Sequence, residues 1–223
     1  MNEEGFRRYY EEYLGIERLA DNGDINLIYS KYRDMPINKR YFHKMIATNY
    51  NGMKIASVST ELNQLLVMSL LEKMDCDVMS HTSVPNCDFF TSYKISYMDR
   101  MTLERTDDSI YNFITEKNSE VDYTYLNKYK KYIALDKSQK EIIGYCKVSD
   151  VISGFGNLVV WVDEKKRRRG IAEKLTRQMI KKCYEDNIEP VYVVREENVP
   201  SISLAKKLGF CVRQRELVVS REG

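Results

Sequence analysis

Residues 158–210 decide the fold of this chain: LVVWVDEKKRRRGIAEKLTRQMIKKCYEDNIEPVYVVREENVPSISLAKKLGF. The β-branched run Asn157–Asp163 predicts a strand. Gly170–Asn187 predicts an amphipathic helix, because apolar residues recur every four positions along one face: Ile171, Leu175, Met179 and Cys183. Pro190–Glu196 predicts the next strand, and Ser201–Gly209 predicts a short helix closed by its glycine. Strands and helices therefore alternate here.

The loop between the first strand and the first helix predicts a phosphate site. Asp163–Arg169 carries five basic and two acidic side chains, a local charge of +3. The first N–H groups of a helix have no partner inside the helix, and they carry a partial positive charge. The small residues Gly170 and Ala172 let a diphosphate come close to this backbone.

Two motifs of this stretch resemble one known family. Arg167-x-x-Gly170-x-Ala172 is similar to the R/Q-x-x-G-x-G/A loop of the GNAT N-acetyltransferase superfamily, which cradles the pyrophosphate of coenzyme A. Segment 198–210, NVPSISLAKKLGF, resembles the N-x-x-A-x-x-L-Y-x-K-L-G-F segment that ends the same superfamily's core. The two motifs stand in the family's order, separated by a helix and a strand. The resemblance covers roughly residues 93–220.

Further strands precede this stretch. Tyr93–Arg105 alternates as a strand does, and Ser109–Lys117 predicts a helical piece. Lys131–Asp150 predicts a hairpin with a polar turn at Asp136–Lys140 and Gly144 inside its second strand. The expected fold class is α/β with a mixed α+β sheet, and the resemblance implies the GNAT-like acyltransferase fold.

The resemblance also implies an activity, an acetyl-CoA-dependent N-acetyltransferase in which an amine attacks the thioester directly. Strands Leu158–Val162 and Val191–Arg195 are expected to splay apart and hold the pantetheine arm. Freed backbone groups of the first strand would then polarise the thioester carbonyl. The residues expected to contact coenzyme A are Val160, Val162, Arg167, Arg168, Arg169, Gly170, Ile171, Ala172, Asn198 and Lys207.

No catalytic residue is assigned from the sequence. Many members of the family carry, at the place of Ala205, a Tyr that protonates the departing thiolate. Ser203, Tyr192 or water are the alternatives here, unless activity is low. Glu196 and Glu197 are candidates for the base that deprotonates the amine, although a solvated strand end is the plainer interpretation.

The first half of the chain gives weaker signals. Helical spacing predicts that about the first 50 residues are helical, from Phe6, Tyr9, Tyr10, Tyr13, Leu14, Ile16 and Leu19. Met53–Ser59 then predicts a strand, Thr60–Met74 a helix capped by Ser59 or Thr60, and Asp77–Val84 a second strand. We expect an N-terminal helical and α-β extension over residues 1–90, which could be a degenerate half of the same fold. The acetyltransferase domain is expected over residues 91–223.

Composition narrows the class of protein. The 35 basic and 33 acidic side chains leave a formal charge of +2, too little to favour nucleic acid or an acidic membrane as partner. The sequence shows neither a signal peptide nor a run of 18 apolar residues. The odd number of scattered cysteines, five in all, indicates thiols of a reducing compartment, so a cytoplasmic location is expected. No metal is expected, because Cys76, His81 and Cys87 lack the spacing of a zinc knuckle and a fourth ligand.

Alternative functions remain open at this point. The acceptor amine is expected on a small molecule or on a protein. A non-catalytic acyl-CoA-binding or sensing module is the alternative to an enzyme, favoured by Ala205. Nucleic-acid binding through Lys165–Arg169 is a third alternative, which the balanced charge of the remaining chain argues against.

Overall fold

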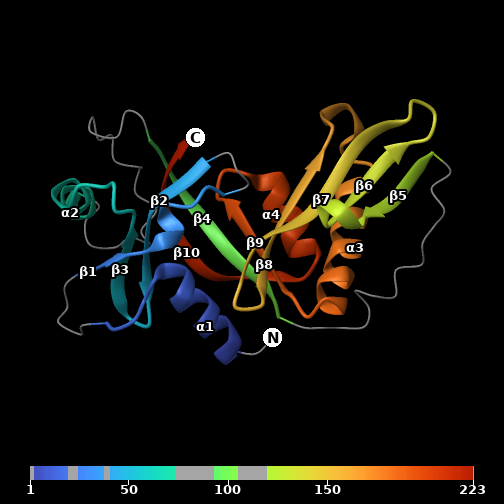
Figure 1. The fold of residues 1–223 in the computed structure, drawn as a ribbon. Coiled ribbons are helices and arrows are strands. Elements are labelled where there is room, and N and C mark those ends of the chain that lie inside the picture. The colour runs from blue at the N-terminus through green and yellow to red at the C-terminus, as the bar shows by residue number, and fades with distance from the viewer. Residues whose placement is uncertain (1–2, 20–24, 38–40, 74–92, 105–119, 223) are drawn as a thin grey trace. The chain divides into compact units, whose positions relative to one another are not determined.

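The computed structural model describes residues 3–19, 25–37, 41–73, 93–104 and 120–222. These residues form two compact units (Figure 1). The C-terminal unit comprises residues 101–193 and 199–211. The N-terminal unit comprises residues 3–100, 194–198 and 212–223. The expected boundary between residues 90 and 91 lies outside the described residues and stays a prediction.

The C-terminal unit is built on a mixed sheet. Its strands lie in the order β9 (Glu189–Arg195), β8 (Phe155–Val162), β7 (Glu141–Ile152), β6 (Lys131–Asp136) and β5 (Val121–Leu126). The β8–β9 pair is parallel, and the other pairs are antiparallel. Strands β6 to β9 confirm the sequence-based expectation. Strand β5 was missed, although Val121, Tyr123 and Tyr125 alternate with polar residues.

Helix α3 (Ile171–Glu185) packs on β6, β7 and β8 through its apolar face. All four residues predicted for this face are buried: Ile171, Leu175, Met179 and Cys183. Gly144 on β7 leaves room for this contact, because a Cβ there would lie 3.1 Å from Leu175 Cδ1 and 3.1 Å from the Trp161 carbonyl oxygen. The second helix of the unit, α4, spans Val199–Lys207.

The N-terminal unit also contains a mixed sheet. Its strands lie in the order β1 (Asn26–Tyr29), β3 (Met53–Val58), β2 (Tyr41–Tyr50), β10 (Phe210–Glu222) and β4 (Lys94–Leu103). Strands β1 and β3 pair in parallel, whereas β2 pairs antiparallel with β3 and with β10. Helix α1 (Glu3–Leu14) buries five of the seven residues predicted for a helical face, whereas Ile16 and Leu19 lie beyond its end. The fold class, mixed α/β, is confirmed.

Two expectations for the N-terminal half need correction, and three others lie outside the described residues. A helical run over the first 50 residues is wrong beyond α1, because β1 and β2 follow it. Helix α2 (Gln64–Lys73) starts later than Thr60, since Asn63 Oδ1 accepts from Leu65 N at 2.8 Å while Ser59 and Thr60 bond Asp34. The expected strand Asp77–Val84, the helix Ser109–Lys117 and the group Cys76, His81 and Cys87 lie outside the described residues.

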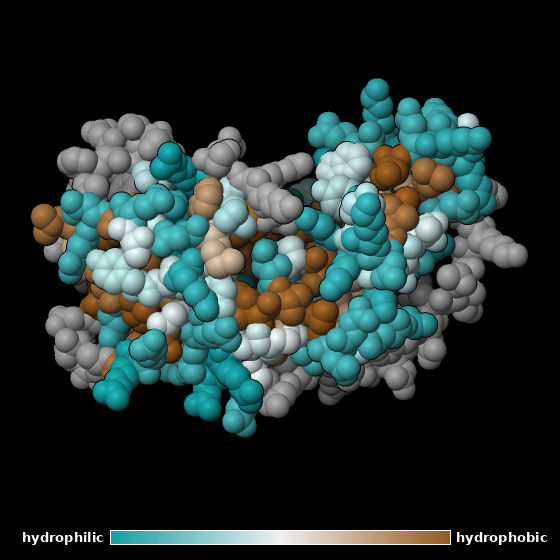
Figure 2. Space-filling view, in the orientation of Figure 1, coloured by the Kyte–Doolittle hydropathy of each residue, from teal (hydrophilic) through white to brown (hydrophobic). Residues whose placement is uncertain are grey.

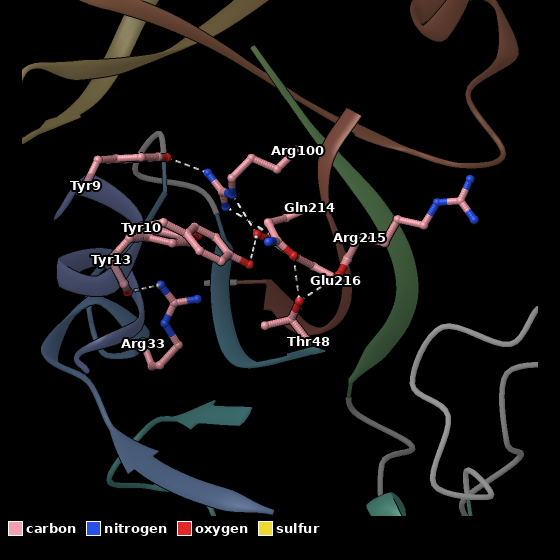
Figure 3. A network of polar contacts seen from close by, with 9 residues as sticks. All are labelled: Tyr9, Tyr10, Tyr13, Arg33, Thr48, Arg100, Gln214, Arg215 and Glu216. Carbon is pink, nitrogen blue, oxygen red and sulfur yellow. Dashed lines mark hydrogen bonds and ion pairs between the residues drawn. The ribbon is translucent and has the colours of Figure 1, made fainter. Parts of the chain in front are cut away.

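A buried ion pair joins strands β4 and β10 to α1 (Figure 3). Arg100 Nε lies 2.6 Å from Glu216 Oε1, and Arg100 Nη2 lies 3.1 Å from Glu216 Oε2. Helix α1 adds the Tyr10 hydroxyl, which donates to Glu216 at 2.9 Å, and the Tyr9 hydroxyl, which accepts from Arg100 Nη1 at 2.5 Å. Each charge is therefore satisfied within the core of the unit.

Both polar and apolar side chains are exposed on the described surface (Figure 2). Figure 2 shows mostly hydrophilic side chains over the β5–β7 region on the face in view. Exposed apolar side chains on this sheet include Ile142 and Val151. No described helix is long and apolar enough to cross a membrane.

The buried pair makes a testable contribution to stability. Glu216→Gln leaves the Arg100 charge buried without its partner, and removing one member of such a pair costs about 3–5 kcal/mol of unfolding free energy. Arg100→Met should cost a similar amount, and the double variant should cost less than the two single variants together. Urea denaturation measures all three.

The exposed pair Lys137–Asp122, at 3.4 Å, supplies the control. Lys137→Met should change the unfolding free energy by less than about 1 kcal/mol. Additive effects of the two buried substitutions would contradict the pairing described here.

Candidate functional site

Strands β8 and β9 separate after a short parallel pairing. The pairing runs over Phe155↔Glu189, Gly156↔Pro190 and Asn157↔Val191. Strand β8 then continues to Val162 without further pairing to β9. The opposite edge of β8 stays paired with β7 as far as Gly144↔Val162. The expected splay therefore begins after Asn157 and Val191.

The antiparallel ladder decides which backbone groups of β8 face this opening. Asp163 N donates to Ile143 O at 2.9 Å, so Asp163 bonds toward β7. Residues of an antiparallel strand alternate between its two neighbours. Leu158, Val160 and Val162 therefore direct their N–H and C=O groups toward the edge from which β9 has separated. The Val162 carbonyl accepts from Arg167 Nε at 3.2 Å, which leaves Val160 in the middle of this edge.

The chain after β8 forms a tight basic loop. Asp163 Oδ1 accepts from Lys165 N at 2.8 Å and starts a 3-10 turn over Glu164–Lys166. Lys166 Nζ bonds Asp136 Oδ2 at 2.8 Å and ties the loop to the β6–β7 turn. Hydrogen bonds from Lys166 and Ser138 hold the pKa of Asp136 well below its ordinary value. The 3-10 turn is thus held by Asp163 at its start and by the Lys166–Asp136 bond at its end.

Helix α3 begins at an open N-terminus. Gly170 is its N-cap residue, with a φ of 74°, so no side chain caps the first turn. A Cβ at Gly170 would meet no atom within 4 Å. The N–H groups of Ile171 and Ala172 precede the first intrahelical bond, from Lys174 N to Gly170 O at 3.0 Å. Unpaired N–H groups at a helix N-terminus can bind an anion.

Two arginines beside this helix end have no ion-pair partner among the described residues. Arg168 and Arg169 are exposed, and in the described part of the chain no acidic side chain pairs with either. Arg167 is exposed as well and lies 3.5 Å from Glu164. The sequence-predicted loop residues therefore come together around the first turn of α3.

Lys207 lies near the first turn of α3, where it forms an ion pair. Its Nζ lies 2.5 Å from Glu173 Oε2, and Arg177 Nη2 lies 3.0 Å from Glu173 Oε1. Burial would raise the pKa of Glu173, but the hydrogen bonds from Lys207 and Arg177 outweigh it and lower that pKa. A direct contact of Lys207 with a ligand stays a prediction.

Helix α4 presents the second motif. Asn198 is exposed and immediately precedes α4, with its N–H donating to Arg195 O at 2.9 Å. Ala205 is fully buried, and it has no hydroxyl that could donate a proton. The alternative Ser203 is exposed. Asn198 as a pantetheine contact stays a prediction.

Tyr192 and Ser201 form a polar pair at the point of strand separation. Tyr192 directly follows Val191, the last residue of β9 paired with β8. Its hydroxyl lies 2.9 Å from Ser201 Oγ, and its ring centre lies 5.5 Å from that of Phe210. Burial raises the pKa of Tyr192 although Ser201 opposes it, so the phenol keeps its proton at neutral pH. The sequence suggested Tyr192 as an acid, but it gave no sign of Ser201 as its partner.

The two candidate bases belong to the N-terminal unit. Glu196 is half-buried and lies 4.0 Å from Arg215 Nε, and its N–H donates to Tyr97 O at 3.1 Å. Glu197 is exposed. Among the described residues, no group of three or more His, Cys, Asp and Glu side chains is placed to hold a metal ion.

Comparison with known proteins agrees with this architecture. Residues 135–219 match the family model described as FR47-like protein. Solved structures resemble the chain at low identity. A GCN5-related N-acetyltransferase-like protein from Streptococcus suis is 13% identical, with 78% of this chain and 73% of that chain covered and a TM-score of 0.52. A Drosophila protein is 15% identical, with a TM-score of 0.51. The match covers 73% of this chain and 59% of the Drosophila chain. No curated protein matches the sequence.

The diverging strand pair, the basic loop and the open helix end define a fold of the GNAT acetyltransferase type. Within it, residues 135–219 are similar to the FR47-like family model, which agrees with the resemblance noted for the C-terminal part of the sequence.

Proposed function

We propose that the protein is an acetyl-CoA-dependent N-acetyltransferase. The observation that carries this proposal is the unpaired edge of β8, which leads directly to the open N-terminus of α3. Coenzyme A fits this arrangement, because the amides of its pantetheine arm can bond a strand edge and its diphosphate is an anion that can bind at a helix N-terminus. The Val160 backbone would bond the arm, and the Ile171 and Ala172 N–H groups with Arg168 and Arg169 would hold the diphosphate.

The reaction follows from these positions. A neutral amine attacks the thioester carbonyl carbon, and a main-chain N–H of β8 stabilises the negative charge that develops on the carbonyl oxygen. The C–N bond forms, the C–S bond breaks, and the nitrogen loses its extra proton to a base or to water. The departing thiolate takes a proton. We assign this donation to Tyr192, with Ser201 holding its hydroxyl, because their pair lies where the strands part.

The proposal extends to the acceptor amine and to the cellular location. We expect the amine to belong to a small molecule or to a protein, without nucleic acid or membrane as partner. The described free thiols include Cys146 and Cys183, which are buried, and a cytoplasmic location suits them.

A non-catalytic acyl-CoA sensor is the second candidate. Buried Ala205 favours it, because the chain lacks a hydroxyl at the position where many family members carry the thiolate's proton donor. Tight coenzyme A binding without thioester turnover, over a panel of amines, would establish the sensor and contradict the enzyme.

The first functional prediction concerns the helix end. Gly170→Asp places a negative charge where the diphosphate should lie, so the affinity for coenzyme A should fall at least ~100-fold, about 2.7 kcal/mol. Gly170→Asn is the matched control, since Asn also tolerates a positive φ and adds nearly the same bulk without charge. Calorimetric titration measures both variants. Equal affinities for the Asp and Asn variants would exclude a diphosphate at this place.

The second functional prediction concerns proton return. Tyr192→Phe keeps the ring contact with Phe210 and removes the hydroxyl, so kcat should fall about 100-fold while the coenzyme A affinity stays the same. Because the raised pKa of Tyr192 keeps the phenol protonated, wild-type kcat should fall only as the pH rises above the ordinary tyrosine value of about 10.

Ser201→Ala should lower kcat less than Tyr192→Phe, and exposed Ser203→Ala should leave it unchanged. An unchanged kcat in a folded Tyr192→Phe variant would assign proton return to another group.

A further inference from the structure

Arg33 is a fully buried cation with unused donors in the N-terminal unit. Its side chain is 0% exposed. Nη2 donates to the Tyr13 carbonyl at 3.2 Å, and the guanidinium lies 4.3 Å from the centre of the Tyr13 ring (Figure 3). Nε and Nη1 have no hydrogen-bond partner. A guanidinium has five N–H donors, so most of its binding capacity is unused.

Two carboxylates in the described part of this unit are committed to other partners. Asp34 accepts from Ser59 and Thr60 and lies 3.8 Å from Lys44 Nζ. Glu216 is occupied by Arg100 and Tyr10. In the described part of the chain, no carboxylate pairs with Arg33. A buried charge without a counter-charge is strongly unfavourable.

A second buried group in the unit also lacks partners. His43 is 5% exposed, and neither Nδ1 nor Nε2 has a hydrogen-bond partner. Burial lowers the pKa of His43 well below its ordinary value, and the charges of Arg33, Arg100 and Arg195 lower it further. The imidazole is therefore neutral and can donate one N–H to an acceptor.

We propose that the N-terminal unit binds a small monocarboxylate at Arg33. A carboxylate accepts two parallel N–H bonds from a guanidinium, which matches the unused donors. One negative charge balances Arg33, whereas a phosphate dianion would leave an excess buried charge. Complete burial limits the ligand to a few atoms. Water would satisfy the donors without neutralising the charge. The proposal does not depend on acetyl transfer.

Thermal denaturation of the full chain tests the site, with sodium acetate and propionate as probes at constant ionic strength. Acetate at 100 times its Kd should raise the Tm of the wild type by roughly 5–10 °C. Arg33→Met should abolish this rise, and without acetate its Tm should equal or exceed that of the wild type, because the unbalanced charge is gone. Arg8→Met, an exposed position on α1, should respond to acetate as the wild type does.

Arg33→Lys gives an independent result if Arg33→Met does not fold. It keeps the charge but cannot form the bidentate hydrogen bonds of a guanidinium. Its calorimetric Kd for acetate should therefore be at least ~10-fold higher than that of the wild type. An unchanged Kd in Arg33→Lys would overturn the proposal, as would a rise in Tm that persists in Arg33→Met. Stabilisation by chloride or phosphate in place of acetate, lost in Arg33→Met, would overturn the carboxylate assignment.

Discussion

Backbone N–H and C=O groups must find partners wherever water is excluded, and this constraint shapes the C-terminal unit. Strand β8 is paired with β7 along one edge to Val162, but its other edge loses β9 after Asn157. At the end of that edge, the Val162 carbonyl accepts from Arg167 Nε. The remaining groups near Val160 are positioned donors and acceptors, and the same strand leads to a helix that has an open first turn.

The two units handle buried polarity in different ways. In the C-terminal unit, polar groups are paired at the edges of the site, as in Tyr192 with Ser201. In the N-terminal unit, Arg100 and Glu216 satisfy each other inside the core, with hydroxyls from α1 completing the arrangement. Arg33 in the same unit lacks such a partner. The contrast between two buried arginines of one unit is what points to an external anion.

Sequence reasoning succeeded where the signal was local. The β-branched run of β8 and the four-residue steps of α3 predicted both elements and the loop between them. Strand β2 was missed because it is mostly buried, so apolar and polar residues do not alternate along it. No local pattern could reveal the Arg100–Glu216 pair, whose members lie 116 residues apart. The burial of Ala205 depended on helix packing, which the motif alone does not specify.

The central claim is that coenzyme A lies along the free edge of β8 with its diphosphate at the start of α3. Titration of the ¹⁵N-labelled full chain with coenzyme A tests it directly through the backbone amide resonances. The account predicts that the amides of Val160, Val162, Ile171 and Ala172 shift together and saturate with a single Kd. Saturable binding that leaves these four amides unmoved would contradict it.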